Sequence, residues 1–356
     1  MACEVLKSRH AVRGPKQKTR MTNQLLPKVC VIGAGAIGGF FGARLARGFA
    51  DVSVVARGAT LQALQSGGWV LESGGQRQAA PVRAVADPAQ LGIQDVVVIA
   101  VKAYALAEVA PLVAPLLGPH TLVLPALNGV PWWFTQGEHG LPVTGWLASS
   151  DPSGAIAAAI PTHAVVGSVV YPACSSPEPG VVRHHSGSRV VFGEPGALAG
   201  TAPSGRLLAL VAMLKAAGFD AEASSDIRTE VWKKLLGNAC FNPVSLITGA
   251  ATDLLIDDPG IYQLFSAMMG ETLAVGAALG IRPGIQVADR IALTRKLGHI
   301  KTSMLQDAEA GRAVEIDAIL GAVTELGRKV GVLTPNLNAV YALARMRAQT
   351  FGLLKS

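Results

Sequence analysis

The chain has 356 residues, of which 50% are hydrophobic and 15% are charged. This composition allows a large buried core and about two domains, and it excludes a mostly disordered chain. The net charge is +7, but residues 1–27 carry six cationic side chains against one acid, so this tail contributes +5 and the rest +2. We therefore expect a folded body behind a disordered basic tail, without a nucleic-acid partner.

The first predicted elements are a strand, a glycine-rich turn and a helix, in KVCVIGAGAIG at 28–38 and the residues that follow. The glycines have the G-x-G-x-x-G spacing that lets a backbone approach a pyrophosphate at a helix N-terminus. A second apolar strand follows at 51–56. The pattern predicts a Rossmann-type dinucleotide-binding domain. The expected cofactor contacts are Gly33, Ala34, Gly35, Ala36, Ile37 and Gly38.

Arg57 follows the second strand, nineteen residues after Gly38. In NAD-binding domains an acid in this region binds the ribose 2′-hydroxyl, whereas an arginine suits a 2′-phosphate. Arg57 therefore predicts NADP as the cofactor, and the alternative is an ordinary exposed arginine at a strand end.

Two further buried strands, within 95–104 and 121–130, end near Lys102 and Asn128. Ligands of an open α/β sheet bind beyond the carboxyl ends of the strands, where Arg57 is also expected. We expect Lys102 to hold cofactor phosphate and Asn128 to bind the nicotinamide side. Taken singly, each could be a surface lysine or a turn asparagine.

More strands are predicted within 165–194, with a turn at Ser186-Gly187, and helices dominate after residue 205. The pattern predicts an α/β protein in which a Rossmann-type domain at 28–225 precedes an all-helical substrate domain at 226–356. The predicted helices are 205–217, 226–247, 259–280, 284–307, 314–330 and 336–351.

One predicted helix has an unusual polar stripe. In EVWKKLLGNACFNP at 230–243, Lys234, Asn238 and Asn242 lie four residues apart, on nearly one helix face. A lysine partly buried in an apolar wall has a lowered pKa that suits a general acid, and asparagines can bind carboxylates and hydroxyls. The alternative is a solvated helix face.

The cysteines and the longest uncharged run argue against a metalloprotein and a membrane protein. Cys3, Cys30, Cys174 and Cys240 show no paired spacing, and the run at 109–137 contains five prolines. Neither pattern suits a metal site or a membrane-spanning helix. We expect a cytoplasmic protein without a metal or a membrane partner; a homodimer is compatible with the sequence.

With these residues in view, the chain resembles the ketopantoate reductase family. The resemblance rests on GAGAIG at 33–38, Lys102 with Asn128-Gly129, the segment 230–243, and SMLQDAEAGRAVEID at 303–317. It implies NADPH-dependent reduction of a small 2-oxo acid, most simply 2-dehydropantoate to pantoate in pantothenate biosynthesis.

The resemblance also implies roles for single residues. It makes Lys234, rather than Lys233, the general acid, and it makes Asn238 and Asn242 substrate ligands. It makes Ser303 a ligand of the substrate carboxylate.

Two further roles follow from the resemblance. Glu315 would contact the cofactor or assist the catalytic network, and Ala173 would offer a backbone contact to NADP. Ser303 and Glu315 are twelve residues apart, about a third of a turn out of phase, so a break near Gly311 is needed for both to face one cleft. The alternative for Glu315 is a surface glutamate near Arg312.

This chain departs from the family at several places. Thr252 stands where the family often has asparagine, Trp132 and Trp133 follow Asn128-Gly129, and 139–163 resembles an insertion. The tryptophans either pack in the core, which we favour, or line the cleft. The departures leave two alternatives open, a reductase of a different small 2-oxo acid and a catalytically silent NADP-binding regulatory protein.

Overall fold

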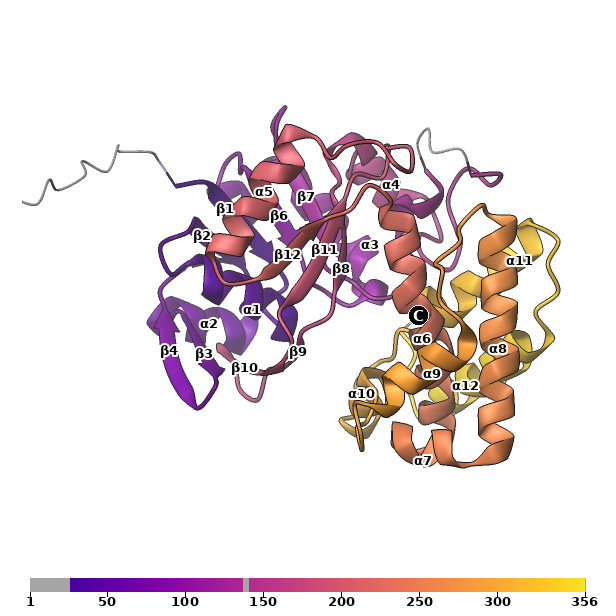
Figure 1. Ribbon diagram of the computed structural model, residues 1–356. Helices are drawn as coiled ribbons and strands as arrows, with labels where there is room; N and C mark the ends of the chain where they lie inside the picture. Colours follow the sequence, from indigo (N-terminus) through magenta and orange to yellow (C-terminus); the bar gives the residue numbers. More distant parts are fainter. Residues whose placement is uncertain (1–25, 137–140, 356) are drawn as a thin grey trace, which may run out of the picture.

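The computed structural model describes residues 26–136 and 141–355. Its N-terminal half is built on a five-stranded parallel sheet with the order β5-β2-β1-β6-β7 (Figure 1). Val29 of β1 pairs with Val52 of β2 on one side and with Val96 of β6 on the other. The strands are β1 Lys28–Ile32, β2 Asp51–Val55, β5 Arg83–Val85, β6 Val96–Ile99 and β7 Leu122–Pro125.

Apolar strands explain why this sheet forms the centre of the domain. All four residues of β6 (VVVI) and of β7 (LVLP) are buried, as expected for parallel strands covered on both faces. Helix α1 (Ala36–Leu45) packs on β1 and β2, and α2 (Gly58–Gly67) packs on β5. The direction of winding reverses between β1 and β6, which is where such sheets bind ligands.

Two smaller sheets extend this half, in the orders β4-β3-β10-β9 and β12-β11-β8. The second adjoins the main sheet, because Val123 of β7 bridges Val165. The predicted strands within 165–194 and the turn at 186–187 are present, with Gly187 at φ 74°. Helix α5 (Gly205–Ala216) packs on β12. The strands are β3 Trp69–Ser73, β4 Gln76–Ala80, β8 Gly167–Val170, β9 Ala173–Ser175, β10 Val181–Ser186, β11 Arg189–Gly193 and β12 Asp220–Ala223.

Short helical turns connect the strands. Trp132 and Trp133 are at most 1% exposed, so both pack in the core, and Trp133 also lines a small cavity beside α6 (Ile227–Thr248). The turns are η1 Pro88–Gln90, η2 Ala103–Ala105, α3 Leu106–Val109, η3 Ala110–Leu116, η4 Trp132–Thr135, α4 Ala155–Ala159 and η5 Thr162–Ala164.

The C-terminal half is helical and is arranged around α6 (Ile227–Thr248), which packs against α8, α10 and α12 and also reaches β8 (Figure 1). Asp226 caps this helix by accepting a hydrogen bond from the backbone N–H of Thr229 at 3.0 Å. The other helices are α7 Thr252–Asp257, α8 Pro259–Ala278, α9 Val287–Arg295, α10 Ser303–Glu309, η6 Asp317–Gly321 (a π-helix), α11 Ala322–Lys329 and α12 Pro335–Thr350.

The single helix predicted at 284–307 is wrong, because α9 and α10 are separate helices. Gly298 between them has φ 73°, a left-handed value that ends a helix. Thr302 then starts α10 by accepting from the backbone N–H of Leu305 at 3.2 Å. The prediction also missed α7, whose first residue is Thr252.

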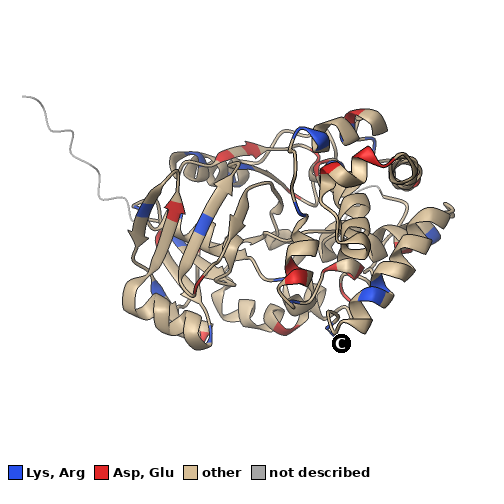
Figure 2. Ribbon diagram, turned by 90° about the horizontal axis from the view of Figure 1, so that it is seen from below, with Lys and Arg blue, Asp and Glu red and all other residues tan. Residues whose placement is uncertain are grey.

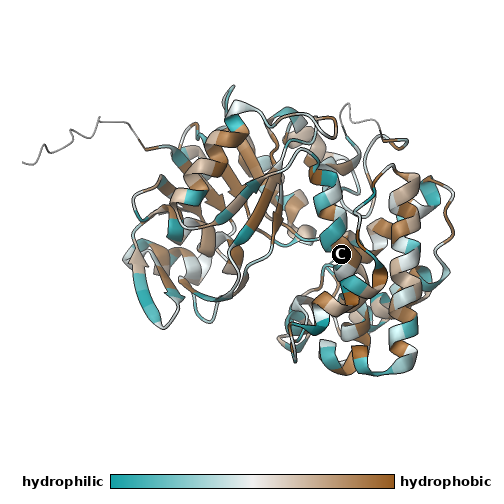
Figure 3. Cartoon of the chain, in the orientation of Figure 1, coloured by the Kyte–Doolittle hydropathy of each residue, from teal (hydrophilic) through white to brown (hydrophobic). Residues whose placement is uncertain are grey.

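The predicted α/β class is confirmed, with a Rossmann-type first half and a helical second half. The central strands are coloured as hydrophobic in Figure 3, and most of the ribbon carries no charge in Figure 2. None of the helices in the described ranges combines the length and the apolar composition of a membrane span. The basic tail predicted at 1–27 lies almost wholly outside the described residues.

Candidate active site

The glycine-rich turn lies where β1 ends and α1 begins. Gly33 has φ 99°, and a Cβ there would overlap the carbonyl group of Ala100 just after β6. A Cβ at Gly38 would overlap the Gly33 carbonyl oxygen. Gly35, the N-cap of α1, has φ −77°, and a Cβ there would meet no protein atom within 4 Å. The fold thus explains Gly33 and Gly38, whereas the open space at Gly35 beside the helix N-terminus fits a phosphate. The remaining residues of the turn are Ala34, Ala36 and Ile37.

Arg57 is the N-cap of α2, just beyond β2 and at the same edge of the sheet as the glycine-rich turn. Its Nη1 lies 2.7 Å from Oε1 of Glu108, and the two side chains are 64% and 67% exposed. An ion pair this exposed is weak. The guanidinium is therefore available to a phosphate that reaches this edge.

Lys234 lies on α6 and points at the loop after β7 and at the last residue of β8. Its Nζ donates to Oδ1 of Asn128 at 2.8 Å and to the carbonyl oxygen of Val170 at 2.5 Å. It also lies 5.8 Å from the ring centroid of Tyr171. Burial lowers the pKa of the Lys234 ammonium to about 8, although the charge of Glu315 opposes the shift. Such a group can give up a proton near neutral pH, as a general acid must.

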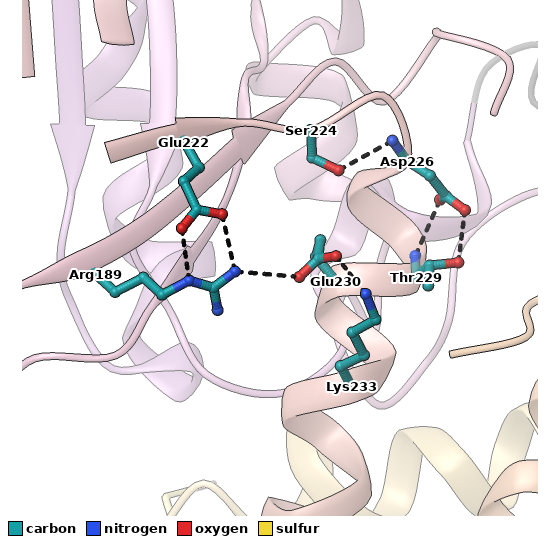
Figure 4. A network of polar contacts seen from close by, with 7 residues as sticks. All are labelled: Arg189, Glu222, Ser224, Asp226, Thr229, Glu230 and Lys233. Carbon is teal, nitrogen blue, oxygen red and sulfur yellow. Dashed lines mark hydrogen bonds and ion pairs between the residues drawn. The ribbon is translucent and has the colours of Figure 1, made fainter. Parts of the chain in front are cut away.

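Lys233 has different surroundings, which Figure 4 shows at the start of α6. Its Nζ donates to Oε1 of Glu230 at 2.7 Å. Oε2 of Glu230 lies 3.9 Å from Nη2 of Arg189, which itself makes a two-pronged pair with Glu222 at 2.9 and 3.0 Å. Lys233 is thus neutralised in a network that ties α6 to β11 and β12, and Lys234 is the lysine presented to the interior.

Asn238 and Asn242 follow Lys234 along α6. Asn242 is 5% exposed, and its Nδ2 has no hydrogen-bond partner within the described ranges. A buried amide without a partner is costly, so this group fits a polar ligand. A small cavity between α6, β8 and the loop after β7 is lined in part by Asn128, Pro131, Trp133, Ser168, Lys234 and Asn238.

Lys102 joins the two halves of the molecule. Its Nζ lies 2.5 Å from Oδ2 of Asp307 and 3.4 Å from Oε2 of Glu315, and Oε1 of Glu315 accepts from the backbone N–H of Ala103 at 2.8 Å. Burial pulls the pKa of Lys102 down, but the two carboxylates outweigh it and raise the pKa overall. Glu315 is buried and paired with Lys102, so it is not the surface glutamate considered above. Asp307, also buried, belongs to this charged network, and no pattern in the sequence indicated it.

Ser303 is the first residue of α10, and its side chain is exposed. The break expected between Ser303 and Glu315 is present, because α10 ends at Glu309 and Gly311 has φ 65°. Ala173 begins β9, where it is exposed and pairs with Ser186 of β10. The contacts described above join Lys102 to Glu315 and Lys234 to Asn128, and neither Ser303 nor Ala173 takes part in them.

Thr252 is turned away from the cavity. It is 2% exposed, and its Oγ1 lies 3.2 and 3.3 Å from the carbonyl oxygens of Gly298 and Ile300. The hydroxyl therefore ties α7 to the segment between α9 and α10. Within the described ranges, no three His, Cys, Asp or Glu side chains gather as a metal site.

Two family models match the chain. The model described as ketopantoate reductase PanE/ApbA matches residues 29–133, and the model of the C-terminal part of ketopantoate reductase PanE/ApbA matches residues 226–348. These ranges contain the glycine-rich turn and α6.

Individual relatives match almost end to end. The 2-dehydropantoate 2-reductase of Mesorhizobium japonicum (strain LMG 29417) is 46% identical over 327 residues, 91% of this chain and 99% of the relative. A solved structure from Ralstonia solanacearum MolK2, described as a candidate ketopantoate reductase, is 46% identical, with a TM-score of 0.88 over 92% of this chain and 100% of that chain. D-mandelate dehydrogenase, solved with NADH and anilino(oxo)acetate, shares the fold at 21% identity and a TM-score of 0.77 over 92% of this chain and 100% of that chain. The chain therefore belongs to the ketopantoate reductase family.

Proposed function

We propose that this chain catalyses the NADPH-dependent reduction of 2-dehydropantoate to pantoate. The chain is an oxidoreductase of a nicotinamide-dependent family that acts on small 2-oxo acids. The observation that carries the proposal is the position of Lys234, whose half-buried ammonium donates to Asn128 and Val170 beside the carboxyl edge of the Rossmann sheet. Burial lowers the pKa of this ammonium to about 8. We also propose that units 28–225 and 226–356 bind the cofactor and the substrate respectively.

When it is bound, the reduced nicotinamide supplies a hydride to C2 of the 2-oxo acid. Lys234 then donates a proton to the alkoxide oxygen, and its charge stabilises that oxygen as negative charge builds up. Asn128 and the Val170 carbonyl orient the ammonium. Asn238 and the unpaired Nδ2 of Asn242 are the proposed ligands of the other substrate oxygens.

For the cofactor, we propose that the glycine-rich turn holds the pyrophosphate and Arg57 the 2′-phosphate of NADP. Release of Arg57 from Glu108 costs little, because both side chains are exposed. Lys102 and Glu315 would lie beside the cofactor, and Ala173 would offer it a backbone contact. D-mandelate dehydrogenase was solved with NADH, so NADH is the competing cofactor to test.

One observation favours a different 2-oxo acid as a second candidate substrate. Thr252, where the family often has asparagine, is buried against backbone carbonyls and does not reach the cavity. This position of the hydroxyl argues against one contact that the family resemblance implies for 2-dehydropantoate. Ser303 remains the proposed hydroxyl ligand of the substrate carboxylate, a group that every 2-oxo acid carries.

The test is to mix the purified protein with NADPH and a panel of 2-oxo acids and to follow the loss of NADPH absorbance. Turnover of 2-dehydropantoate above the other acids supports the proposal. Selective turnover of another acid keeps the reaction class and removes 2-dehydropantoate as the substrate. Tight NADPH binding without turnover of any acid would favour the silent regulatory protein.

A further inference from the structure

Arg290 on α9 has an unusual position against α6. Its guanidinium lies on the backbone of Gly237, so closely that a Cβ at Gly237 would overlap it. Glycine is unfavourable in the interior of a helix. A glycine at 237 is explained if the guanidinium of Arg290 must lie here, because any larger residue would displace it.

Within the part of the chain that the structure describes, no carboxylate pairs with Arg290. Among the described residues its side-chain hydrogen bond is to Oγ1 of Thr294, one turn along its own helix, at 2.6 Å, and none of the ion pairs includes it. Arg295 on the same helix, in contrast, lies 2.6 Å from Asp257. Burial lowers the pKa of Arg290, and the neighbouring titratable groups that oppose this are Cys240 and Tyr171. A partly buried guanidinium without a carboxylate is poised to bind an anion.

Arg290 and Lys234 both lie near Tyr171, which belongs to the N-terminal half. On a helical projection at about 100° per residue, Gly237 lies about 60° to one side of Lys234. Asn238 and Asn242 lie about 40° and 80° to the other side. Glu230 and Lys233, on the flank of Gly237, neutralise each other. The cavity described above lies on the asparagine side of Lys234, and Arg290 does not line it. A substrate with its C2 oxygen at Lys234 and its hydroxyl groups at the asparagines would extend past Lys234 and turn its remaining C2 substituent towards Arg290.

We propose that Arg290 binds the carboxylate of the 2-oxo acid substrate and makes the enzyme prefer acids to neutral 2-oxo compounds. The inference rests on the proposed function, since the substituent that remains at C2 of a 2-oxo acid is the carboxylate. A guanidinium binds a carboxylate through two parallel hydrogen bonds. A carboxylate has enough lone pairs to accept from Ser303 as well.

The test compares 2-dehydropantoate with its neutral lactone. In Arg290→Gln we expect KM for the acid to rise roughly 10- to 100-fold, the usual worth of a hydrogen bond to a charged group, with kcat nearly unchanged. KM for the lactone should stay the same, and Arg290→Lys should recover part of the loss. Arg282→Gln is the matched control, because Arg282 precedes α9 and is exposed.

A second variant tests the position of the guanidinium without removing Arg290, in case Arg290→Gln does not fold. Gly237→Ala keeps the charge but displaces the guanidinium, so it should lower the preference for the acid as Arg290→Gln does. Binding of 2-dehydropantoate to the NADP-loaded protein is titrated in parallel, so the inference is decided even without turnover. An unchanged acid-to-lactone ratio and an unchanged Kd in both variants would overturn it. Failure of the wild-type protein to reduce any 2-oxo acid would instead overturn the proposed function.

Discussion

Lys233 and Lys234 are neighbours in the sequence with opposite surroundings. Glu230 pairs with Lys233, whereas the hydrogen bonds of Lys234 within the described structure go to two neutral acceptors. We expect Lys234→Ala to lower kcat roughly 10²- to 10⁴-fold, because the proton donor is lost. Lys233→Ala is the control and should leave kcat within a few-fold. Steady-state kinetics with NADPH measures both, and equal losses in the two variants would remove the distinction.

The lowered pKa of Lys234 predicts a pH dependence. The ammonium form donates the proton, so kcat for reduction should fall about tenfold per pH unit above pH about 8. The folded pKa lies below the unfolded value of about 10.4. Burial of the charge therefore costs stability below pH about 8, and the cost disappears as the pH rises towards the unfolded pKa. A pH profile of kcat checks this, and a flat profile from pH 7 to 10 contradicts it.

Arg57 predicts the choice of cofactor. Arg57→Asp replaces a guanidinium with a group that repels a 2′-phosphate, so the ratio of kcat/KM for NADPH over NADH should fall on the order of 10²-fold. Glu108→Gln, which removes the partner of Arg57, should leave the ratio the same or raise it. If Arg57→Asp keeps the wild-type ratio, Arg57 does not hold the phosphate.

The residue types at the site could be predicted only where a pattern carried them. The four-residue spacing of Lys234, Asn238 and Asn242 is visible in the sequence. Asp307 and Arg290 look like ordinary charged residues of surface helices. What distinguishes them is burial by elements distant in the chain, namely the loop that holds Lys102 and the backbone at Gly237.

At the scale of elements, the turn from β1 to α1 contains one glycine that the fold requires and another that we expect to serve cofactor binding. Gly35→Ala meets no protein atom, so we expect stability close to wild type and weaker binding of NADPH. Gly38→Ala pushes a Cβ into the Gly33 carbonyl, so it should lower the free energy of unfolding by about 1–3 kcal/mol. Thermal unfolding and a cofactor titration measure the two effects. Equal NADPH affinity for Gly35→Ala and wild type would show that the space beside Gly35 is not used.

The elements predicted correctly are those with a continuous apolar run or a long helical pattern that starts at a clear cap. Strands such as VVVI in β6 are wholly buried, and α6 is a long helix with a clear cap. The strand β4, QRQAA, is mostly polar and lies at a sheet edge, so it has little apolar periodicity to detect. The break between α9 and α10 was missed because the apolar pattern continues through Gly298, and a single glycine is tolerated within a predicted helix.

At the scale of the whole molecule, the loop after β7 rests directly on the helical half. Gly129 has φ 86°, a Cβ there would overlap the Ala318 carbonyl oxygen of η6, and Val130 donates to that oxygen at 2.8 Å. Gly129→Ala should lift the loop and move Asn128 away from Lys234. We expect kcat to fall roughly tenfold or more, with a loss of about 1–3 kcal/mol of stability.

Gly145→Ala is the matched control for this loop. Gly145 has φ 85° but no neighbouring atom within 4 Å of its Cβ position. The variant has the backbone strain without the clash, so it should lose about 1 kcal/mol of stability and keep kcat. A similar kcat in both variants would mean that the contact between the halves does not position Asn128.

The separation of α9 from α10 also bears on how this scaffold could diversify. Because Gly298 and Thr302 end one helix and start the next, α9 can change its sequence without shifting Ser303. The glycine-rich turn between β1 and α1 lies in the other half of the chain, so changes in α9 should not move it either. A library of substitutions confined to Val287–Arg295 could therefore change the substrate preference of the reductase. The proton donor and the cofactor site would keep their wild-type sequence.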